Sequence, residues 1–348
     1  MKAWVCREFR DPYVMAIEEM PEPQPGPGEV QIRVAAAGLA FGETLVLKGT
    51  YQKTPPLPYI PVSEMSGVVA AVGEGVGRVR VGDRVSAFSF ELAGGGLGQV
   101  ATLPETYVFP APVGMGLIEA AAFPMNFWTA WNALVDRGAL RAGETLVVHG
   151  ATGGIGVAAV SVGKALGARV IATGGDDARL AQVAALGADH VINLRDQDLR
   201  ATVKALTDGR GADVFVDPVG GAVFEQSLRC IAPGGRVLTV GFTSGEWAVA
   251  RTNVLLMKMI SVIGVEARLA IETTGGRGLA SFERMFAAVA EGRLEPHVGQ
   301  VYPFEAAREG YADILARRHV GKSVLVVAPA LCGMTADGET LGPATEII

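Results

Sequence analysis

The stretch that decides the fold is Leu146-Val147-Val148-His149-Gly150-Ala151-Thr152-Gly153-Gly154-Ile155-Gly156, an apolar run followed by a glycine-rich turn and a helical pattern. The glycines stand where a strand must turn, where a pyrophosphate must approach bare backbone, and where a helix must pack closely on a sheet. Free N–H groups and the positive dipole end of the helix favour an anion by about 0.3–1 kcal/mol. The stretch predicts a dinucleotide-binding loop whose residues are Gly150, Gly153, Gly154, Ile155 and Gly156.

Around this loop, apolar runs alternate with helical stretches from about residue 120, as a doubly wound parallel sheet requires. Six strands are expected at Thr145–His149, Arg169–Thr173, His190–Ile192, Asp213–Asp217, Gly235–Gly241 and Met259–Val265. Helices are expected at Ile155–Leu166, Ala178–Leu186, Asp198–Thr207 and Ala222–Cys230. This pattern predicts an α/β protein with a complete six-stranded Rossmann sheet.

The first 120 residues differ from this pattern, since short β-type runs separated by Pro and Gly clusters predict a compact β-rich unit. Its strands are expected near Val30–Ala36, Met65–Val72 and Arg84–Phe88. After the sixth Rossmann strand, we expect the amphipathic stretch Leu279–Ala290, the segment Gly299–Phe304, a helix at Glu305–Ala316 and a strand at Ser323–Val327 to complete the first unit. The tail Ala328–Ile348 has no clear period, which predicts a loose segment or one packed on a neighbour.

Composition excludes several classes of protein. A chain of 348 residues suits two domains, and its 49% hydrophobic and 19% charged residues suit a folded α/β protein. A formal charge of −6 with no basic run argues against a nucleic-acid surface. We expect neither a signal peptide nor a membrane span, and so predict a cytoplasmic protein. The three cysteines, Cys6, Cys230 and Cys332, form no C-x-x-C pair, which predicts buried reduced thiols.

The end of the second strand bears on the choice of nicotinamide cofactor, because NAD enzymes place an acid there against the ribose 2′-hydroxyl. This strand ends in Thr173 and Gly174, followed by Gly175, with Arg179 one helical turn later. Space and a guanidinium favour a 2′-phosphate, and we therefore expect NADPH. Asp176 and Asp177 would repel that phosphate unless they face away as N-cap residues, and an ordinary surface role for Arg179 remains the alternative.

With these residues in view, the sequence resembles the medium-chain dehydrogenase/reductase superfamily, and within it the zinc-independent quinone oxidoreductase branch that includes zeta-crystallin. The resemblance runs nearly end to end. It is carried by Pro25-Gly26-Pro27-Gly28-Glu29-Val30, Gly49-Thr50-Tyr51, Val72-Gly73-Glu74-Gly75-Val76, Val81-Gly82-Asp83-Arg84-Val85, Gly187-Ala188-Asp189-His190-Val191-Ile192-Asn193 and Asp217-Pro218-Val219-Gly220-Gly221.

The resemblance implies a GroES-like, β-rich catalytic domain over residues 1–122 and 266–348, with the Rossmann NADP-binding domain over 123–265 between them. It also implies a homodimer whose Rossmann sheets join edge to edge through the last strand, here near Met259–Val265. Where related alcohol dehydrogenases carry the cysteine and histidine that hold zinc, this chain has Ala40 and Ser63. We therefore expect no zinc, and structural roles for His149, His190, His297 and His319.

Further site residues are implied by matching positions. The substrate pocket is expected to contain Ala40, Phe41, Tyr51 and Ser63, with Tyr51 either donating to a developing oxyanion as the catalytic group or packing as an aromatic residue. The cofactor is expected to lie near Thr129, Gly241, Phe242 and Lys322, although a solvated surface role is the simpler expectation for Lys322.

The sequence is compatible with three functions. The first is an NADPH-dependent reductase of a quinone or another small electrophile with an activated C=C or carbonyl, since such an acceptor needs no Lewis acid. The second is a reductase of acyl-CoA or similar C=C substrates. The third is an NADPH-binding, crystallin-like protein with little turnover. Ala40 keeps the third open, because the quinone reductase branch usually has Asn there, and Val62 and Ser63 also replace the usual Gly-x pair before Glu64.

Overall fold

The computed structural model describes residues 1–11, 13–89, 94–274 and 276–335. Within it the chain forms two compact units, each with its own core. Unit 1 consists of residues 1–125, 297–318 and the residues from 322 onward, and unit 2 consists of residues 126–296 together with 319–321.

Unit 2 contains the expected six-stranded parallel sheet, in the strand order β10-β9-β8-β11-β12-β13. This is the order 3-2-1-4-5-6 of a dinucleotide-binding Rossmann sheet. The strands are β8 (Thr145–Val148), β9 (Arg169–Gly174), β10 (His190–Asn193), β11 (Ala212–Asp217), β12 (Ile231–Thr239) and β13 (Ser261–Gly264). Its reversal point lies between β8 and β11, where the chain changes the direction in which it adds strands.

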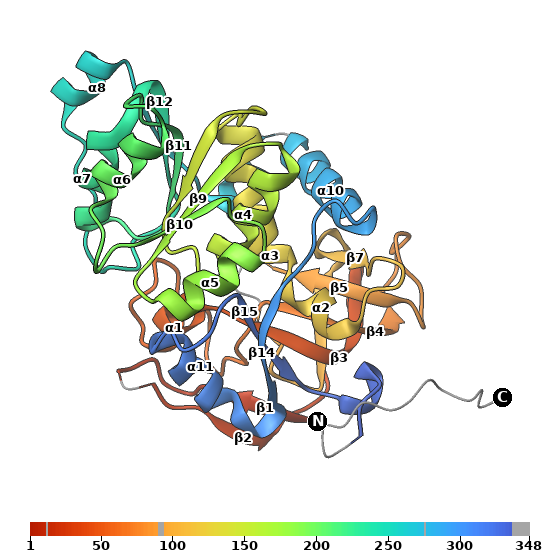
Figure 1. Ribbon diagram of the computed structural model, residues 1–348. Helices are drawn as coiled ribbons and strands as arrows, with labels where there is room; N and C mark the ends of the chain where they lie inside the picture. Colours follow the sequence, from red (N-terminus) through yellow and green to blue (C-terminus); the bar gives the residue numbers. More distant parts are fainter. Residues whose placement is uncertain (12, 90–93, 275, 336–348) are drawn as a thin grey trace. The chain divides into compact units, whose positions relative to one another are not determined.

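Helices cover both faces of this sheet (Figure 1). The helices that follow the strands are α4 (Gly154–Ala165), α5 (Asp177–Ala185), α6 (Leu199–Leu206), α7 (Gly221–Cys230) and α8 (Thr252–Lys258). On one face, α6 and α7 join a core with Val147, Ile171 and Phe215. On the other face, α4 packs so closely that a Cβ on Gly163 would lie 2.6 Å from a methyl of Leu146.

Residues 266–296, which the sequence assigns to the first domain, pack in unit 2. They contain α9 (Ala267–Glu272) and α10 (Arg277–Ala290), which lie against α3 (Pro124–Trp131). The Trp128 indole donates to the carbonyl of Ala267 at 2.9 Å, and the ring of Phe282 lies 5.5 Å from that of Trp128. An amphipathic pattern shows that a helix has a buried face but not which neighbour covers it.

Unit 1 is built on a seven-stranded sheet in the order β14-β15-β3-β4-β5-β7, with β6 also paired to β3. These strands are β3 (Glu29–Leu39), β4 (Glu64–Val72), β5 (Arg84–Phe88), β6 (Val100–Pro104), β7 (Val108–Pro110), β14 (Val298–Pro303) and β15 (Lys322–Val326). A two-stranded sheet of β1 (Lys2–Val5) and β2 (Ala16–Glu19) stands beside it. The unit also contains the helical segments η1 (Glu105–Tyr107), η3 (Phe304–Ala306), α1 (Phe41–Leu47), α2 (Leu117–Ala122) and α11 (Ala307–Leu315).

The predicted α/β class and the two kinds of domain are confirmed, and the differences are local. β12 begins at Ile231, four residues before the expected strand, because Ile231 pairs with Ala212 ahead of a register shift. The apolar run before the last strand forms α8, and the π-helical turn η2 (Asn132–Arg137) continues α3. In the tail, the N–H groups of Val327 and Ala328 donate to the carbonyl of Ala35, and η4 (Pro329–Cys332) comes directly after them. Residues 336–348 lie outside the described part. No described helix has the length and hydrophobicity to cross a bilayer.

Candidate functional site

The predicted phosphate loop lies between β8 and α4. Glycine is required or favoured at each of its three positions for a different steric reason. Gly150 has a φ of +56°, which a side chain disfavours. A Cβ on Gly156 would lie 2.4 Å from the carbonyl oxygen of Gly150, so α4 sits against the turn. Gly153 is exposed at the N-cap of α4, where a Cβ would meet nothing closer than 3.4 Å. The loop therefore presents bare backbone at the N-terminus of α4, where Gly321 forms a parallel β-bridge with Gly153, and this arrangement is a cradle that fits a diphosphate.

Two segments distant in the sequence border this cradle. Asn126 of α3 reaches the first turn of α4, since a Cβ on Gly154 would lie 2.3 Å from its amide nitrogen. Gly321 donates to the carbonyl of Thr152 at 2.9 Å, which is why residues 319–321 belong to unit 2. Thr129, a predicted cofactor residue, lies one turn after Asn126 and is buried. Nothing in the sequence near Asn126 distinguished it from the rest of α3.

Two arginines lie near the carboxyl end of β9, Arg179 in α5 and Arg195 after β10. Asp176 is the N-cap of α5 and accepts the N–H of Arg179 at 2.9 Å, while the amide of Asn193 holds the carboxylate of Asp177 at 2.8 Å. The expected N-cap role of Asp176 is thus confirmed. The Arg179 guanidinium lies 3.4 Å from Asp176.

Arg195 was missed by sequence reasoning, although it follows β10 at the same edge of the sheet. Its Nε lies 3.3 Å from the position of a Cβ on Gly175. The N–H of Arg179, together with the guanidinium groups of Arg179 and Arg195, lowers the pKa of Asp176. The rule that ligands bind at the carboxyl ends of parallel strands was the signal that could have found Arg195.

A buried polar chain runs beneath the loop through His149. Its Nδ1 lies 2.8 Å from the hydroxyl of Thr173 and its Nε2 lies 2.7 Å from that of Ser227. Because Ser227 donates to the carbonyl of Val223, Nε2 carries the proton and Nδ1 accepts from Thr173. Burial lowers the pKa of His149 to about 4, opposed by the nearby Asp217. His149 is therefore structural, as expected, and the hydroxyl of the predicted cofactor residue Thr173 is used inside the protein.

The loop after β11 stands next to the phosphate loop. Asp217 accepts the N–H groups of Val219 and Gly220 at 2.8 and 2.9 Å, and the methyl of Val219 lies 3.3 Å from the Cβ position of Gly150. The predicted Gly241 and Phe242 follow β12 beside this loop, because a Cβ on Gly220 would lie 2.9 Å from the Phe242 ring. Unit 2 thus gathers loop and strand ends at its switch point, as the fold predicts.

The four predicted substrate-pocket residues lie in unit 1. Ala40 is the N-cap of α1 and Phe41 is its first residue. The ring of Tyr51, whose residue is 36% exposed, lies 3.8 Å from the Cβ position of Gly42, one position after Phe41. Ser63 is buried directly before β4. The ring of Tyr51 therefore lies beside Gly42, in the first turn of α1 that Phe41 begins.

Lys322 is not the solvated residue that its sequence suggested. It is 3% exposed and lies 2.5 Å from a carboxylate oxygen of Glu64, in an ion pair whose two side chains are both 4% exposed. Glu64 also accepts the N–H of Met125 at 2.7 Å. The correction has a plain cause, since Lys322 begins β15 beside β3 in the middle of the sheet, where Gly38 leaves room for its stem.

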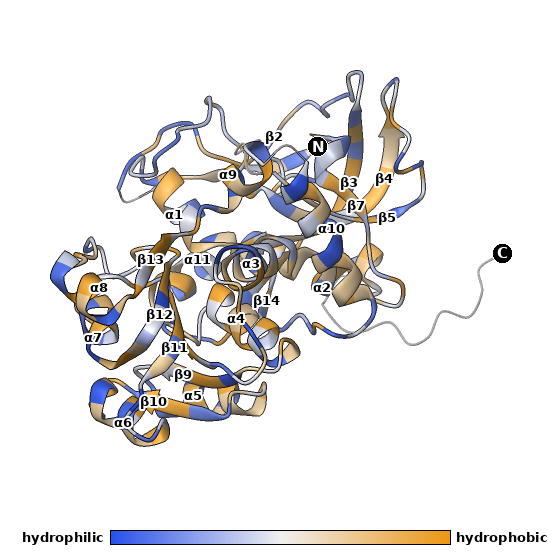
Figure 2. Ribbon diagram, turned by 90° about the horizontal axis from the view of Figure 1, so that it is seen from above, coloured by the Kyte–Doolittle hydropathy of each residue, from blue (hydrophilic) through white to orange (hydrophobic). Residues whose placement is uncertain are grey.

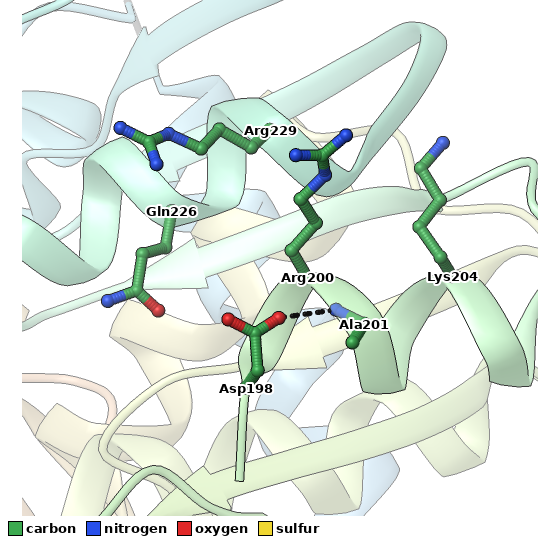
Figure 3. A pocket seen from close by; sticks show the side chains of 6 residues that line it. All are labelled: Asp198, Arg200, Ala201, Lys204, Gln226 and Arg229. Atoms are coloured by element: carbon green, nitrogen blue, oxygen red, sulfur yellow. Dashed lines mark hydrogen bonds between the residues drawn. The ribbon is translucent and has the colours of Figure 1, made fainter.

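Among the described residues no group of three or more His, Cys, Asp or Glu side chains is placed to hold a metal ion. A shallow depression of about 560 Å³ lies between α6 and α7 and is lined by Asp198, Arg200, Ala201, Lys204, Gln226 and Arg229 (Figure 3). It contains none of the predicted site residues, and the side chains drawn there come from the outer surfaces of both helices. We do not assign the reaction to it.

Comparison with known proteins agrees with this arrangement. Residues 26–113 match the alcohol dehydrogenase GroES-like domain and residues 154–274 match the zinc-binding dehydrogenase family. Quinone oxidoreductase-like protein 2 of Bos taurus is 33% identical over 331 residues, covering 93% of this chain and 92% of that protein.

Two solved structures extend the comparison. The quinone oxidoreductase of Escherichia coli complexed with NADPH superposes with a TM-score of 0.83 at 27% identity, covering 94% of this chain and all of that one. An NAD-dependent alcohol dehydrogenase superposes with a TM-score of 0.82 at 34% identity over the same shares.

Proposed function

We propose that this chain reduces a quinone or another activated C=C or carbonyl compound with NADPH and without zinc. The premise is that the chain belongs to the medium-chain dehydrogenase/reductase superfamily, among its quinone oxidoreductase-like members, and is therefore an oxidoreductase. The observation that carries this proposal is the glycine turn at the N-terminus of α4, where Gly153 is exposed and a Cβ would meet nothing closer than 3.4 Å. NADPH, when bound, would supply the hydride.

The residues of this chain would hold the cofactor and orient the acceptor. Backbone N–H groups at the start of α4 suit the diphosphate, and the amide of Asn126 borders them. For the 2′-phosphate we propose Arg179 and Arg195, which flank Gly175 at the end of β9 where NAD enzymes have an acid. Charge-assisted hydrogen bonds of this kind contribute about 1.5–3 kcal/mol each.

The zinc-independent part of the proposal rests on Ala40 and Ser63, because an alanine offers no ligand atom and a serine is a poor substitute for imidazole. An electron-poor acceptor tolerates the lack of a Lewis acid better than an alcohol does. We propose that the Tyr51 hydroxyl donates to an oxyanion that develops on the reduced acceptor, and the position of its ring beside the first turn of α1 supports this role. Its neighbours Ala40 and Phe41 supply an apolar wall at the start of α1.

We further propose a homodimer formed through β13. In the described part of the sheet, β13 pairs with β12 alone, so its outer edge has backbone groups available for a second chain. Beside it, Leu256, Met257 and Met259 are 78%, 81% and 76% exposed, and Figure 2 colours much of α8 as hydrophobic. Large apolar side chains exposed next to an open sheet edge favour association. A cytoplasmic location stays a prediction from the sequence.

The experiment compares the oxidation of NADPH and NADH by the purified protein with 9,10-phenanthrenequinone or 1,4-benzoquinone. We expect quinone-dependent turnover with NADPH preferred, and a rise of about ten-fold or more in the KM for NADPH in Arg195→Ala and Arg179→Ala with little change for NADH. Arg200→Ala, an exposed arginine on α6, is the matched control. Tight NADPH binding without turnover favours the crystallin-like alternative, and a preference for NADH contradicts the cofactor proposal.

A further inference from the structure

The segment that leads into β4, residues 59–63, contains a strained backbone position. Val62 has a φ of +72°, a left-handed conformation in which a β-branched side chain is a steric outlier. Its side chain is fully buried in the core of unit 1. The chain therefore keeps a valine in a conformation that suits glycine, directly before the pocket residue Ser63, and the surrounding structure must hold it there.

The carbonyl groups of this segment accept hydrogen bonds from backbone N–H groups of residues 89 and 95–97. Gly95, Leu97 and Gly96 donate in turn to the carbonyls of Ile60, Pro61 and Val62 at 2.9, 3.0 and 2.8 Å. Ser89 donates to the carbonyl of Ser63 at 2.7 Å. The N–H groups of Val62 and Ser63 are buried with this segment and need an acceptor of their own.

That acceptor is Glu43 in α1. Its residue is 7% exposed, and its carboxylate accepts the Tyr59 hydroxyl at 3.2 Å. The backbone N–H groups of Val62 and Ser63 also face it. Burial raises the pKa of Glu43, and the Tyr59 hydroxyl, these N–H groups and the charge of Lys322 oppose the rise. A buried carboxylate with three donors converging on it is a strong clamp for the turn that they belong to.

We propose that Glu43 is a positioning residue that holds Val62 in its left-handed conformation and thereby sets the floor of the substrate pocket at Ser63. The inference rests on the proposed function in one respect, that the acceptor enters the pocket of Ala40, Phe41, Tyr51 and Ser63. Without the carboxylate, Val62 relaxes toward negative φ, and Ser63 turns with it. Glycine at position 62 has no such preference and keeps the turn without help.

Kinetics test the clamp through a double-variant comparison. For Glu43→Ala we expect kcat/KM for the quinone to fall about ten-fold or more, while the Kd for NADPH is unchanged because its site is in unit 2. In a Val62→Gly background the same substitution lowers kcat/KM by less than about three-fold. Glu43→Gln retains an acceptor and stays within about three-fold of the wild type. Glu105→Ala is the matched control, since that carboxylate also accepts two backbone N–H groups but at an exposed turn.

A crystal structure of the variants provides a reading that does not depend on turnover. The φ of residue 62 becomes negative in Glu43→Ala and stays positive in Glu43→Ala/Val62→Gly. Should Glu43→Ala not fold, Glu43→Asp keeps the carboxyl group, withdraws it by one methylene, and gives the same fall and the same change of φ. An unchanged φ with kcat/KM within three-fold of the wild type overturns the proposal. A changed φ in a protein whose wild type reduces no quinone supports the clamp and contradicts the proposed function.

Discussion

His149 shows how a residue in the most conspicuous motif of the chain can serve structure alone. It ends the apolar run before the glycine turn, yet its ring is fully buried between two hydroxyl groups and against the ring of Phe215. The neutral imidazole satisfies one donor and one acceptor, so protonation would bury a charge and break the bond from Thr173.

This arrangement makes stability depend on pH. The folded pKa of His149 is about 4, below the ordinary value of 6.5, so the unfolded chain binds the proton more tightly. Stability from this group is fully present above pH 6.5 and is lost as the pH falls toward 4, by about 3 kcal/mol in all. Urea unfolding of the wild type and of His149→Gln across this range isolates the contribution as the difference between their slopes. His190→Gln is the control, and equal slopes in the wild type and His149→Gln would contradict the assignment.

At the level of single residues, the sequence predicted where the backbone turns or packs closely better than it predicted which side chains meet. Gly150, Gly153 and Gly156 could be interpreted from their spacing because their roles are steric and local. Arg195 could not be found in the same way, since the turn that brings it to Gly175 depends on sheet register. Lys322 was misjudged for a related reason, because its partner Glu64 is 258 positions away in the chain.

Among the elements, the unit β8–turn–α4 leaves no room for a side-chain atom at position 156. A Cβ at position 156 would lie 2.4 Å from the Gly150 oxygen and 2.6 Å from the Cα of Ala151, and both are backbone atoms that cannot rotate away. The helix would have to move off the strand. We expect Gly156→Ala to lower the free energy of unfolding by about 1–3 kcal/mol or more.

Thermal unfolding of Gly156→Ala beside Gly153→Ala tests this packing. The second variant places the same methyl group three residues earlier, where it meets nothing closer than 3.4 Å, and is expected to unfold close to the wild type. Equal melting temperatures for all three proteins would show that α4 does not depend on its contact with the turn.

Elements with a strong period or a glycine boundary were predicted within a few residues, such as α4, α5 and β9. α8 was missed because its apolar residues run without an amphipathic period into the last strand. The apolar residues of α8 show no amphipathic period because they also occupy its exposed face. Leu256, Met257 and Met259 are all exposed in the described chain. An apolar run without an amphipathic period, left unassigned before the predicted last strand, is therefore a surface helix next to a sheet edge.

For the molecule as a whole, the two kinds of domain follow from the sequence, whereas the placement of residues 266–296 does not, because the contact of α10 with Trp128 joins segments about 150 positions apart. The same limit applies to quaternary structure, which composition cannot show.

The proposed dimer predicts that a charge on α8 separates the subunits. Met257→Glu places a carboxylate among the exposed apolar side chains of α8, and its burial at an interface would cost several kcal/mol. Light scattering after size-exclusion chromatography should give a dimer for the wild type and a monomer for the variant. Val113→Glu, a fully exposed position in unit 1, is the control. A monomeric wild type would contradict the dimer.

The most direct test of the account is calorimetric titration of NADPH into the wild type, Gly153→Ala and Gly77→Ala. Both substitutions add a methyl group where there is space for it, but only that at Gly153 stands in the cradle at the start of α4. The account predicts binding by the wild type and by Gly77→Ala, and affinity weakened about ten-fold or more in Gly153→Ala with an unchanged melting temperature. Equal affinity in all three proteins, or no binding by the wild type at millimolar NADPH, would contradict it.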